Sequence, residues 1–458
     1  MSEALQPFYY GIVFVSMIYT FYKVGVNKIS FLVILIFWAG AFEYLRDITE
    51  YPIDDYYKVF VVIIAVNCSW RRIFKIKSKY DYYVNIIFVL FSISFWISYI
   101  LYGGNIFTIL SQYLFKYSLI FILYHYFKDI KFNSNKGHYL GEVILTILIV
   151  QIFLSAIKLL FIGIKTDIGD YEPIVGSMSA GGAGTAVVIP VMALIFYWVL
   201  MNRKFERKNW FIAASFLIIA FASAKRQPIV FFPLILYLLF SYVQKGVSLL
   251  SMAKYLPFVI LLFMAGVKLN PSFNPDNKVW GRFDIDFVTE YASEYYFGTP
   301  AFGQVFSKSY DFSFGRGAGI VYYFQPDKLS LHAPKELLWG KGRYEVATGA
   351  KGRFTKTHEA GYGIQHSGLM GEAGAMLYSF GYMGTIFMVM LAIVIIRKLK
   401  DKRMALIILL YYMWDFLFYY NQVVYTSQSG VILLFIIFYD NSILDQLKSH
   451  NDIIEINP

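Results

Sequence analysis

The apolar run YLGEVILTILIVQIFLSAIKLLFIGI, residues 139–164, decides the fold class of this chain. It exceeds the roughly 20 residues that a helix needs to cross the hydrocarbon core of a bilayer, and only Glu142 and Lys158 interrupt it. Similar runs recur along the sequence, so we expect an all-α, polytopic bundle of about 13 transmembrane helices (range about 11–14). The predicted spans are 7–22, 29–42, 56–70, 82–101, 106–127, 139–164, 183–201, 210–224, 228–243, 255–267, 370–396, 404–422 and 428–444.

The composition supports the same class. Of the 458 residues, 58% are hydrophobic and only 16% are charged, with a mean hydropathy of +0.54. Soluble globular proteins carry roughly 25% charged residues, so a soluble enzyme, a disordered chain and a nucleic-acid-binding domain are excluded. The single Cys68 and six scattered histidines lack the spacing of a metal site. We expect no metal, no cofactor, no nucleic-acid partner and no cleavable signal peptide.

Basic residues alternate between the predicted loops. Loops of one parity carry most of the Lys and Arg residues, near positions 23–28, 71–79, 128–136, 203–208, 245–254, 397–403 and 448. The short loops of the other parity carry only Arg46, Lys58, Lys165, Lys225 and Arg226. Because cytoplasmic loops are enriched in Lys and Arg, the first group is predicted to be cytoplasmic. The N-terminus is then expected outside and the C-terminus inside, and much of the net charge of +11 reflects topology.

One long segment divides the chain into three predicted parts. These are N-terminal transmembrane helices over 1–267, an external loop over 268–369, and C-terminal transmembrane helices with a short cytoplasmic tail over 370–458. Loops longer than about 15 residues are usually functional or disordered. This loop is rich in aromatic residues such as Trp280 and Trp339, so we expect a folded cap. A cap over a bundle favours a function at the outer membrane boundary.

Two adjacent cations stand out at the predicted outer mouth of the bundle. Lys225 and Arg226 lie in SAKRQP, residues 223–228, where the positive-inside rule disfavours positive charge. A bound phosphate or diphosphate explains them, because a guanidinium group offers a fork of donors that matches phosphate oxygens. Snorkelling toward anionic headgroups is the alternative. In the long loop, Arg316 of GRGAG and Arg343 are weaker candidates for the same ligand.

Three other residues carry candidate chemistry. His366 precedes the predicted span 370–396, at the outer rim, and histidine is the side chain best suited to proton transfer near neutral pH. An ordinary rim histidine is the alternative. Lys158 and Asp415 lie inside predicted spans, both roughly 9–11 Å below the outer boundary. Their matched depth permits an ion pair within the membrane. A charge buried in a membrane span also suggests a functional role for the residue.

Three segments together resemble the bacterial O-antigen polymerase and O-antigen ligase family. They are GSMSAGGAGT at 176–185, ASAKRQP at 222–228, and LLWGKGR at 337–343, the last followed by His366 and by GYMG at 381–384. The resemblance implies a fold of the lipid-linked-sugar (GT-C type) glycosyltransferases in the bacterial inner membrane, with a periplasmic N-terminus. It implies a metal-independent polymerase that joins undecaprenyl-diphosphate-linked repeat units of O-antigen (lipopolysaccharide), capsule or exopolysaccharide at the periplasmic face. A chain-length regulator protein would be its partner.

The resemblance also assigns roles. Lys225 and Arg226 would hold the leaving diphosphate, helped by Arg316 and Arg343, and His366 would orient or deprotonate the acceptor hydroxyl. The ligases space their histidine motif and the next glycine about one helical turn more closely than this chain does. A polymerase is therefore preferred over a ligase that transfers the glycan to lipid A core. A flippase for lipid-linked oligosaccharide is the alternative of another class, but few intramembrane charges and an external cap favour an enzyme.

Overall fold

The structure is a computed structural model that describes most of the predicted spans. The described residues are 5–102, 106–132, 135–162, 176–177, 183–202, 209–222, 256–269, 274–276, 278, 280–290, 324, 333–340, 371–418 and 427–456. Over these residues the chain is helical and has no strand, as predicted. Each predicted apolar segment overlaps a helix except 228–243, which lies outside the described residues.

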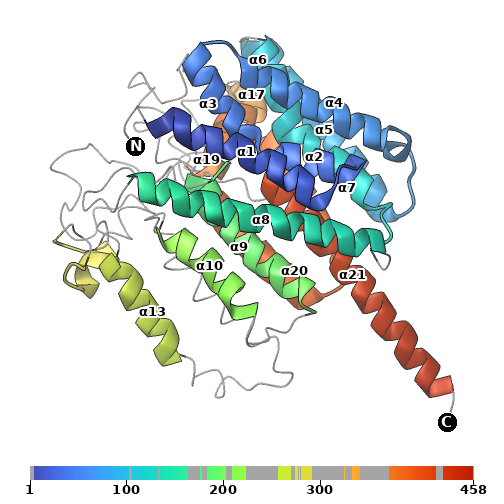
Figure 1. The fold of residues 1–458 in the computed structure, drawn as a ribbon. Coiled ribbons are helices and arrows are strands. Elements are labelled where there is room, and N and C mark those ends of the chain that lie inside the picture. The colour runs from blue at the N-terminus through green and yellow to red at the C-terminus, as the bar shows by residue number, and fades with distance from the viewer. Residues whose placement is uncertain are drawn as a thin grey trace.

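The helices keep the labels of Figure 1. They are α1 (Gln6–Val24), α2 (Lys28–Phe37), α3 (Ala39–Thr49), α4 (Ile53–Ile73), α5 (Lys79–Tyr102), α6 (Ile106–Gln112), the π-helix η2 (Tyr113–Ser118), α7 (Leu119–Phe127), α8 (Asn135–Ile162), α9 (Ala183–Leu200), α10 (Trp210–Ala222), α13 (Leu256–Leu269), α17 (Pro334–Trp339), α19 (Glu372–Arg397), α20 (Lys402–Phe418) and α21 (Ser427–Ile456). The consecutive elements α6, η2 and α7 fill the predicted span 106–127.

Several helices are suited to a membrane. Four are long and apolar enough to cross one: Lys79–Leu101 in α5, Asn135–Lys158 in α8, Glu372–Arg397 in α19 and Ser427–Gln446 in α21. The bent pair α2–α3 is a fifth if it counts as one span. The presence of these helices indicates that the chain is a membrane protein. The described residues do not confirm about 13 spans or the folded external cap, because helices such as α10 and α13 are shorter than a bilayer crossing.

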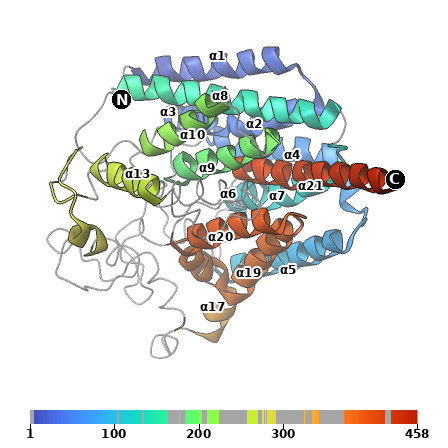
Figure 2. The same ribbon diagram turned by 90° about the horizontal axis from the view of Figure 1, so that it is seen from below.

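The bundle is layered. The helices α1 and α8 form one face, and α5, α17 and α19 form the opposite face (Figures 1 and 2). Between them lie α2, α7, α9 and α21, and α21 contacts both α7 and α9. The apolar part of α21 is the most enclosed of the four candidate spans. The core therefore forms around α21, which explains why its side chains over Val431–Ile437 are buried.

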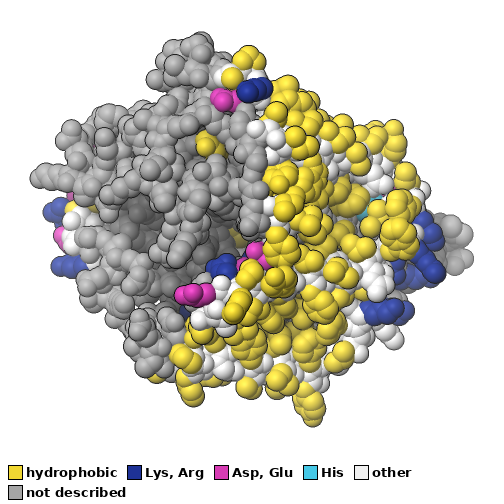
Figure 3. Space-filling view, turned by 90° about the horizontal axis from the view of Figure 1, so that it is seen from above, with side chains coloured by type: hydrophobic (Ala, Val, Ile, Leu, Met, Phe, Trp, Pro, Cys, Tyr) yellow, Lys and Arg dark blue, Asp and Glu magenta, His cyan; other side chains and the backbone are white. Residues whose placement is uncertain are grey.

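The described loops that the charge alternation groups together, near residues 23–28, 71–79, 128–132 and 397–403, lie at one end of the bundle. The turn after α1 contacts the start of α8, where Tyr139 Oη donates to the Val24 carbonyl. Lys77, before α5, and Asp129, after α7, form an ion pair at 2.6 Å. Lys398, after α19, joins the same region. Figure 3 shows Lys and Arg side chains at one edge of a broad apolar band. We call this region, residues 25–27, 74–78, 128–132 and 398–401, the basic end.

Candidate functional site

The predicted diphosphate and catalytic residues lie outside the described part of the chain. They are Lys225, Arg226, Arg316, Arg343 and His366. Their roles therefore stay predictions. Parts of the segments that carry the family resemblance are described, namely residues 176–177 and 183–185 of GSMSAGGAGT, residue 222 of ASAKRQP, residues 337–340 of LLWGKGR and residues 381–384 of GYMG. The structure shows how these motif segments are positioned.

The helical structure is interrupted deep in the bundle, between α2 and α3. We call this interruption the helix break. The two helices are bent by 53° relative to each other, and the fully buried Trp38 lies between them. The Trp38 indole donates its N–H to the carbonyl of Val13 at 3.0 Å. A helix that ends leaves its last four carbonyl groups without intrahelical partners. Away from water each unsatisfied group costs several kcal/mol, so the break needs donors from elsewhere in the fold.

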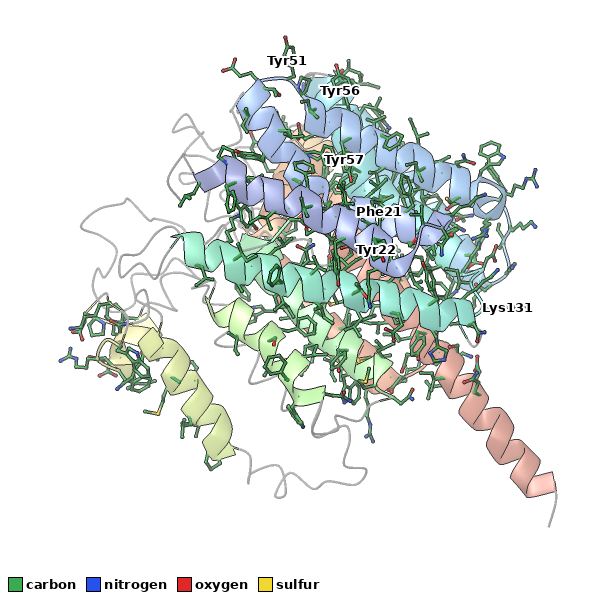
Figure 4. The ribbon with its side chains drawn as sticks, in the orientation of Figure 1. Phe21, Tyr22, Tyr51, Tyr56, Tyr57 and Lys131 are labelled. Atoms are coloured by element: carbon green, nitrogen blue, oxygen red, sulfur yellow. The ribbon has the colours of Figure 1, made fainter. Side chains whose placement is uncertain are left out.

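The fold supplies a donor for each of these four carbonyl groups. The carbonyl of Ile34 accepts the backbone N–H of Trp38 at 3.1 Å. The other three accept from side chains of α4, α21 and the turn at 176–177: Leu35 from Tyr57 Oη (2.6 Å), Ile36 from Gln428 Nε2 (3.0 Å) and Phe37 from Ser177 Oγ (3.0 Å). The end of α2 is thus capped by side chains that are distant in sequence. Figure 4 shows Tyr57 within the bundle.

The turn at Gly176–Ser177 is itself held from two other helices. Gln151 of α8 accepts the Ser177 N–H at 2.8 Å and donates to its Oγ at 2.7 Å. Tyr9 of α1 donates to the Gly176 carbonyl at 2.9 Å. Gly176 has a φ of +65°, a conformation that favours glycine, and a Cβ there would lie 2.3 Å from the Gln151 side-chain oxygen and 3.2 Å from the Gln151 carbonyl oxygen. The first two residues of GSMSAGGAGT are therefore built into the helix break.

Lys158 lies beside this cluster. Its side chain is only 3% exposed, and Nζ lies 5.2 Å from the centroid of the Tyr9 ring. The negative face of the ring stabilises the cation in a setting where an isolated charge is costly. Asp415, predicted from matched depth as its ion-pair partner, is buried on α20. In Figure 2, α9 lies between α8 and α20, and the contact found for Lys158 is with Tyr9.

A second motif contact joins α17 to a kink in α19. Gly381 has a φ of +63° and interrupts the helical geometry of α19, while Gly340 follows α17 with a φ of +79°. A Cβ on Gly340 would lie 2.4 Å from the backbone nitrogen of Phe380. A Cβ on Gly381 would lie 2.5 Å from the backbone of Leu338. The two backbones touch with no room for side chains, so LLWGKGR and GYMG both need glycine where they meet.

Two carbonyl groups at the kink accept hydrogen bonds from side chains. Ser98 of α5 donates to the Ser379 carbonyl at 2.7 Å, and Thr385 donates to the Gly381 carbonyl at 2.7 Å. The first half of α19 is thereby fixed between α5 and α17. This half begins at Glu372, shortly after His366 in the sequence.

The sequence pattern did not predict the helix break or the residues that cap it. One signal was present: Ala39, Gly40 and Ala41 place small residues inside the predicted span 29–42, which permits close approach of other segments. The donors at positions 57, 177 and 428 carry no local signal, because their role depends on contacts far apart in sequence. Among the described residues, no group of three or more His, Cys, Asp or Glu side chains could hold a metal ion.

Comparison of the chain with protein families, with curated proteins and with solved structures finds no match.

Proposed function

We propose that this chain is an inner-membrane polysaccharide polymerase, a glycosyltransferase that joins undecaprenyl-diphosphate-linked repeat units at the periplasmic face. The observation that carries the proposal is the contact between α17 and the kink of α19. It joins LLWGKGR to GYMG through Gly340 and Gly381. In the sequence, Arg343 ends the first segment and His366 precedes the second. An anchor on the bundle at positions close in sequence to these two residues supports a site between the predicted cap and the membrane helices.

The reaction in this proposal is a glycosyl transfer. The acceptor hydroxyl oxygen bonds to the anomeric carbon of the donor sugar, and the bond from that carbon to the diphosphate oxygen breaks. The hydroxyl proton goes to His366, and the diphosphate leaves with the electron pair of the broken bond. Lys225 and Arg226, with Arg316 and Arg343 as weaker helpers, bind the negative charge that develops there. Fixed positive groups placed at a developing charge lower the barrier.

Lys158 supports the proposal from the described part of the chain. It is a buried cation that lies beside the first residues of GSMSAGGAGT, another motif that carries the resemblance. Tyr9 connects the two, because its ring faces Lys158 and its hydroxyl group bonds Gly176. Tyr9 thus links a buried basic side chain to a motif that carries the resemblance.

Polymer synthesis in cells that lack the chromosomal gene tests the proposal. We expect His366→Ala and Arg226→Ala to abolish chain extension, with single lipid-linked repeats left on the outer leaflet. Gel electrophoresis of the polysaccharide and mass spectrometry of the lipid-linked fraction measure this. Lys400→Gln is the matched control, since it removes one charge at the basic end. Chains of normal length in both site variants would refute the proposal.

The ligase alternative predicts a different product. Loss of a ligase leaves finished polymer on undecaprenyl diphosphate that is not joined to lipid A core. Loss of a polymerase leaves single repeats. The same mass-spectrometric measurement therefore separates the two enzymes.

A transporter is the second candidate, and the α2–α3 break is the observation that favours it. Discontinuous helices form the substrate and ion sites of many transporters. Here, however, the last turn of α2 is capped by Tyr57, Gln428 and Ser177, so these side chains already use the carbonyl groups that would bind an ion. Loss of a transporter would trap lipid-linked repeats on the inner leaflet, whereas loss of a polymerase leaves them on the outer leaflet.

A further inference from the structure

The end of α4 carries two adjacent pairs of exposed side chains. Trp70 and Phe74 are 59% and 72% exposed, and their ring centroids lie 5.5 Å apart at an interplanar angle of 82°. Arg71 and Lys75, each one position further along, are also exposed. Arg71 lies in the last turn of α4 and Lys75 in the turn that follows the helix, so each of the two rings is followed directly in the chain by a cation. We call the aromatic pair and the cation pair the two rows.

The backbone beneath these rows is held in place. The carbonyl of Lys75 accepts a hydrogen bond from the buried Nζ of Lys128 at 2.7 Å. Lys77 pairs with Asp129 at 2.6 Å, and the Arg72 guanidinium lies 3.6 Å from the same carboxylate. The exposed rows therefore project from a turn that α7 and the residues after it hold in position.

The carboxylates near this turn already have partners. Asp81 is buried and lies within 3.7 Å of two ammonium groups. Asp129 forms ion pairs with Lys77 and Arg72. In the part of the chain that the structure describes, no carboxylate pairs with Arg71 or Lys75. Positive charge without an acidic partner thus lies next to exposed aromatic surface.

We propose that this surface, formed by Trp70, Arg71, Phe74 and Lys75, binds the headgroup of an anionic phospholipid. The two cations hold the phosphodiester, because Arg and Lys form strong charge-assisted hydrogen bonds to phosphate oxygens. The aromatic rings lie at the level of the glycerol backbone, where Trp and other aromatic residues of membrane proteins concentrate. Figure 3 shows cations at the edge of the apolar band, as a headgroup boundary requires. The exposed rings favour a lipid over a free phosphate ion.

Fluorescence quenching in bilayers tests the lipid site. The full-length protein is placed in nanodiscs that contain brominated phosphatidylglycerol or, at the same mole fraction, brominated phosphatidylcholine. The contribution of Trp70 is the difference between the wild-type protein and Trp70→Phe. We expect about two-fold stronger quenching of Trp70 by the anionic lipid, since juxtamembrane cations attract anionic headgroups. The double variant Arg71→Gln/Lys75→Gln should abolish this preference.

The control removes equal charge from the same end of the bundle. Lys400→Gln/Lys402→Gln should retain the lipid preference of Trp70, because Lys400 precedes α20 and is paired with Asp445, and Lys402 is the first residue of α20. Equal quenching by the two lipids in the wild-type protein overturns the proposal. So does a preference that persists in Arg71→Gln/Lys75→Gln, or one that millimolar glycerol phosphate in solution removes. Unchanged thermal unfolding of the double variant establishes that it is folded, as exposed side chains predict.

Discussion

Asp81 contacts several segments of the basic end through its carboxylate. Its carboxylate accepts the hydroxyl group of Tyr124 at 2.9 Å and lies 3.5 Å and 3.7 Å from the ammonium groups of Lys128 and Lys398. It also caps the start of α5 by accepting two backbone N–H groups. Burial lowers the pKa of Lys128 and of Lys398, and the charge of Asp81 opposes that shift. One acidic side chain therefore keeps two enclosed cations charged.

Replacing Asp81 by Asn should be strongly destabilising. The change removes the counter-charge that two enclosed ammonium groups share, and breaking a buried ion pair costs about 3–5 kcal/mol. Thermal unfolding in detergent measures the loss. Asp445→Asn is the matched control, because Asp445 pairs with Lys400 on the exposed surface and should contribute less than about 1 kcal/mol. Equal effects of the two changes would contradict the role given to Asp81.

The same variant should show a distinct pH dependence. Without Asp81, the pKa values of Lys128 and Lys398 in the folded state should fall further below the unfolded value of about 10.4. Between the folded and unfolded pKa values, the unfolded chain then binds more protons than the folded chain. The stability of Asp81→Asn should therefore rise as pH increases toward about 10, more steeply than that of the wild-type protein. Unfolding midpoints across alkaline pH measure this, and parallel curves would count against it.

At the scale of elements, the α2–α3 break depends on donors from other helices. Gln428→Leu and Tyr57→Phe each remove one hydrogen bond to a buried carbonyl group at the end of α2. Each should destabilise the fold by about 1–3 kcal/mol, since the carbonyl group is left unsatisfied. Denaturation in detergent is the measurement. Ser215→Ala is the control, because Ser215 is bonded to the carbonyl of Phe211 in its own helix and should cost less than about 0.5 kcal/mol.

The α17–α19 contact depends on two glycines. Gly340→Ala and Gly381→Ala place a Cβ within 2.5 Å of the opposing backbone, at positions where φ is positive. Each should detach α17, at a cost of more than about 1 kcal/mol. Faster tryptic cleavage after Lys335 in α17 measures the detachment. Gly11→Ala is the control, because a Cβ at Gly11 meets nothing within 4 Å. Unchanged cleavage in both variants would show that α17 does not depend on this contact.

For the whole molecule, local patterns predicted the helices better than the contacts between them. The apolar run 139–164 is long enough to identify α8 without any knowledge of its neighbours. The bend within 29–42 was not predictable, because it is stabilised by donors from positions 57, 177 and 428. Depth along a helix likewise did not identify Tyr9 as the contact of Lys158, since depth does not specify which face of the bundle a helix occupies. The cations predicted to bind diphosphate lie outside the described residues.

The membrane orientation is the remaining property of the whole molecule that the charge pattern predicts. Lys131 lies at the basic end, while Tyr51 precedes α4, at the opposite end of that helix from residues 74–78 (Figure 4). Cys68 is the only cysteine in the chain, so a Cys68→Ala background can carry either Tyr51→Cys or Lys131→Cys. If the basic end is cytoplasmic, a membrane-impermeant maleimide should label the cysteine of Tyr51→Cys in spheroplasts and that of Lys131→Cys only after permeabilisation. Labelling of Lys131→Cys in sealed spheroplasts would reverse the orientation and place the site proposed for glycosyl transfer on the cytoplasmic side.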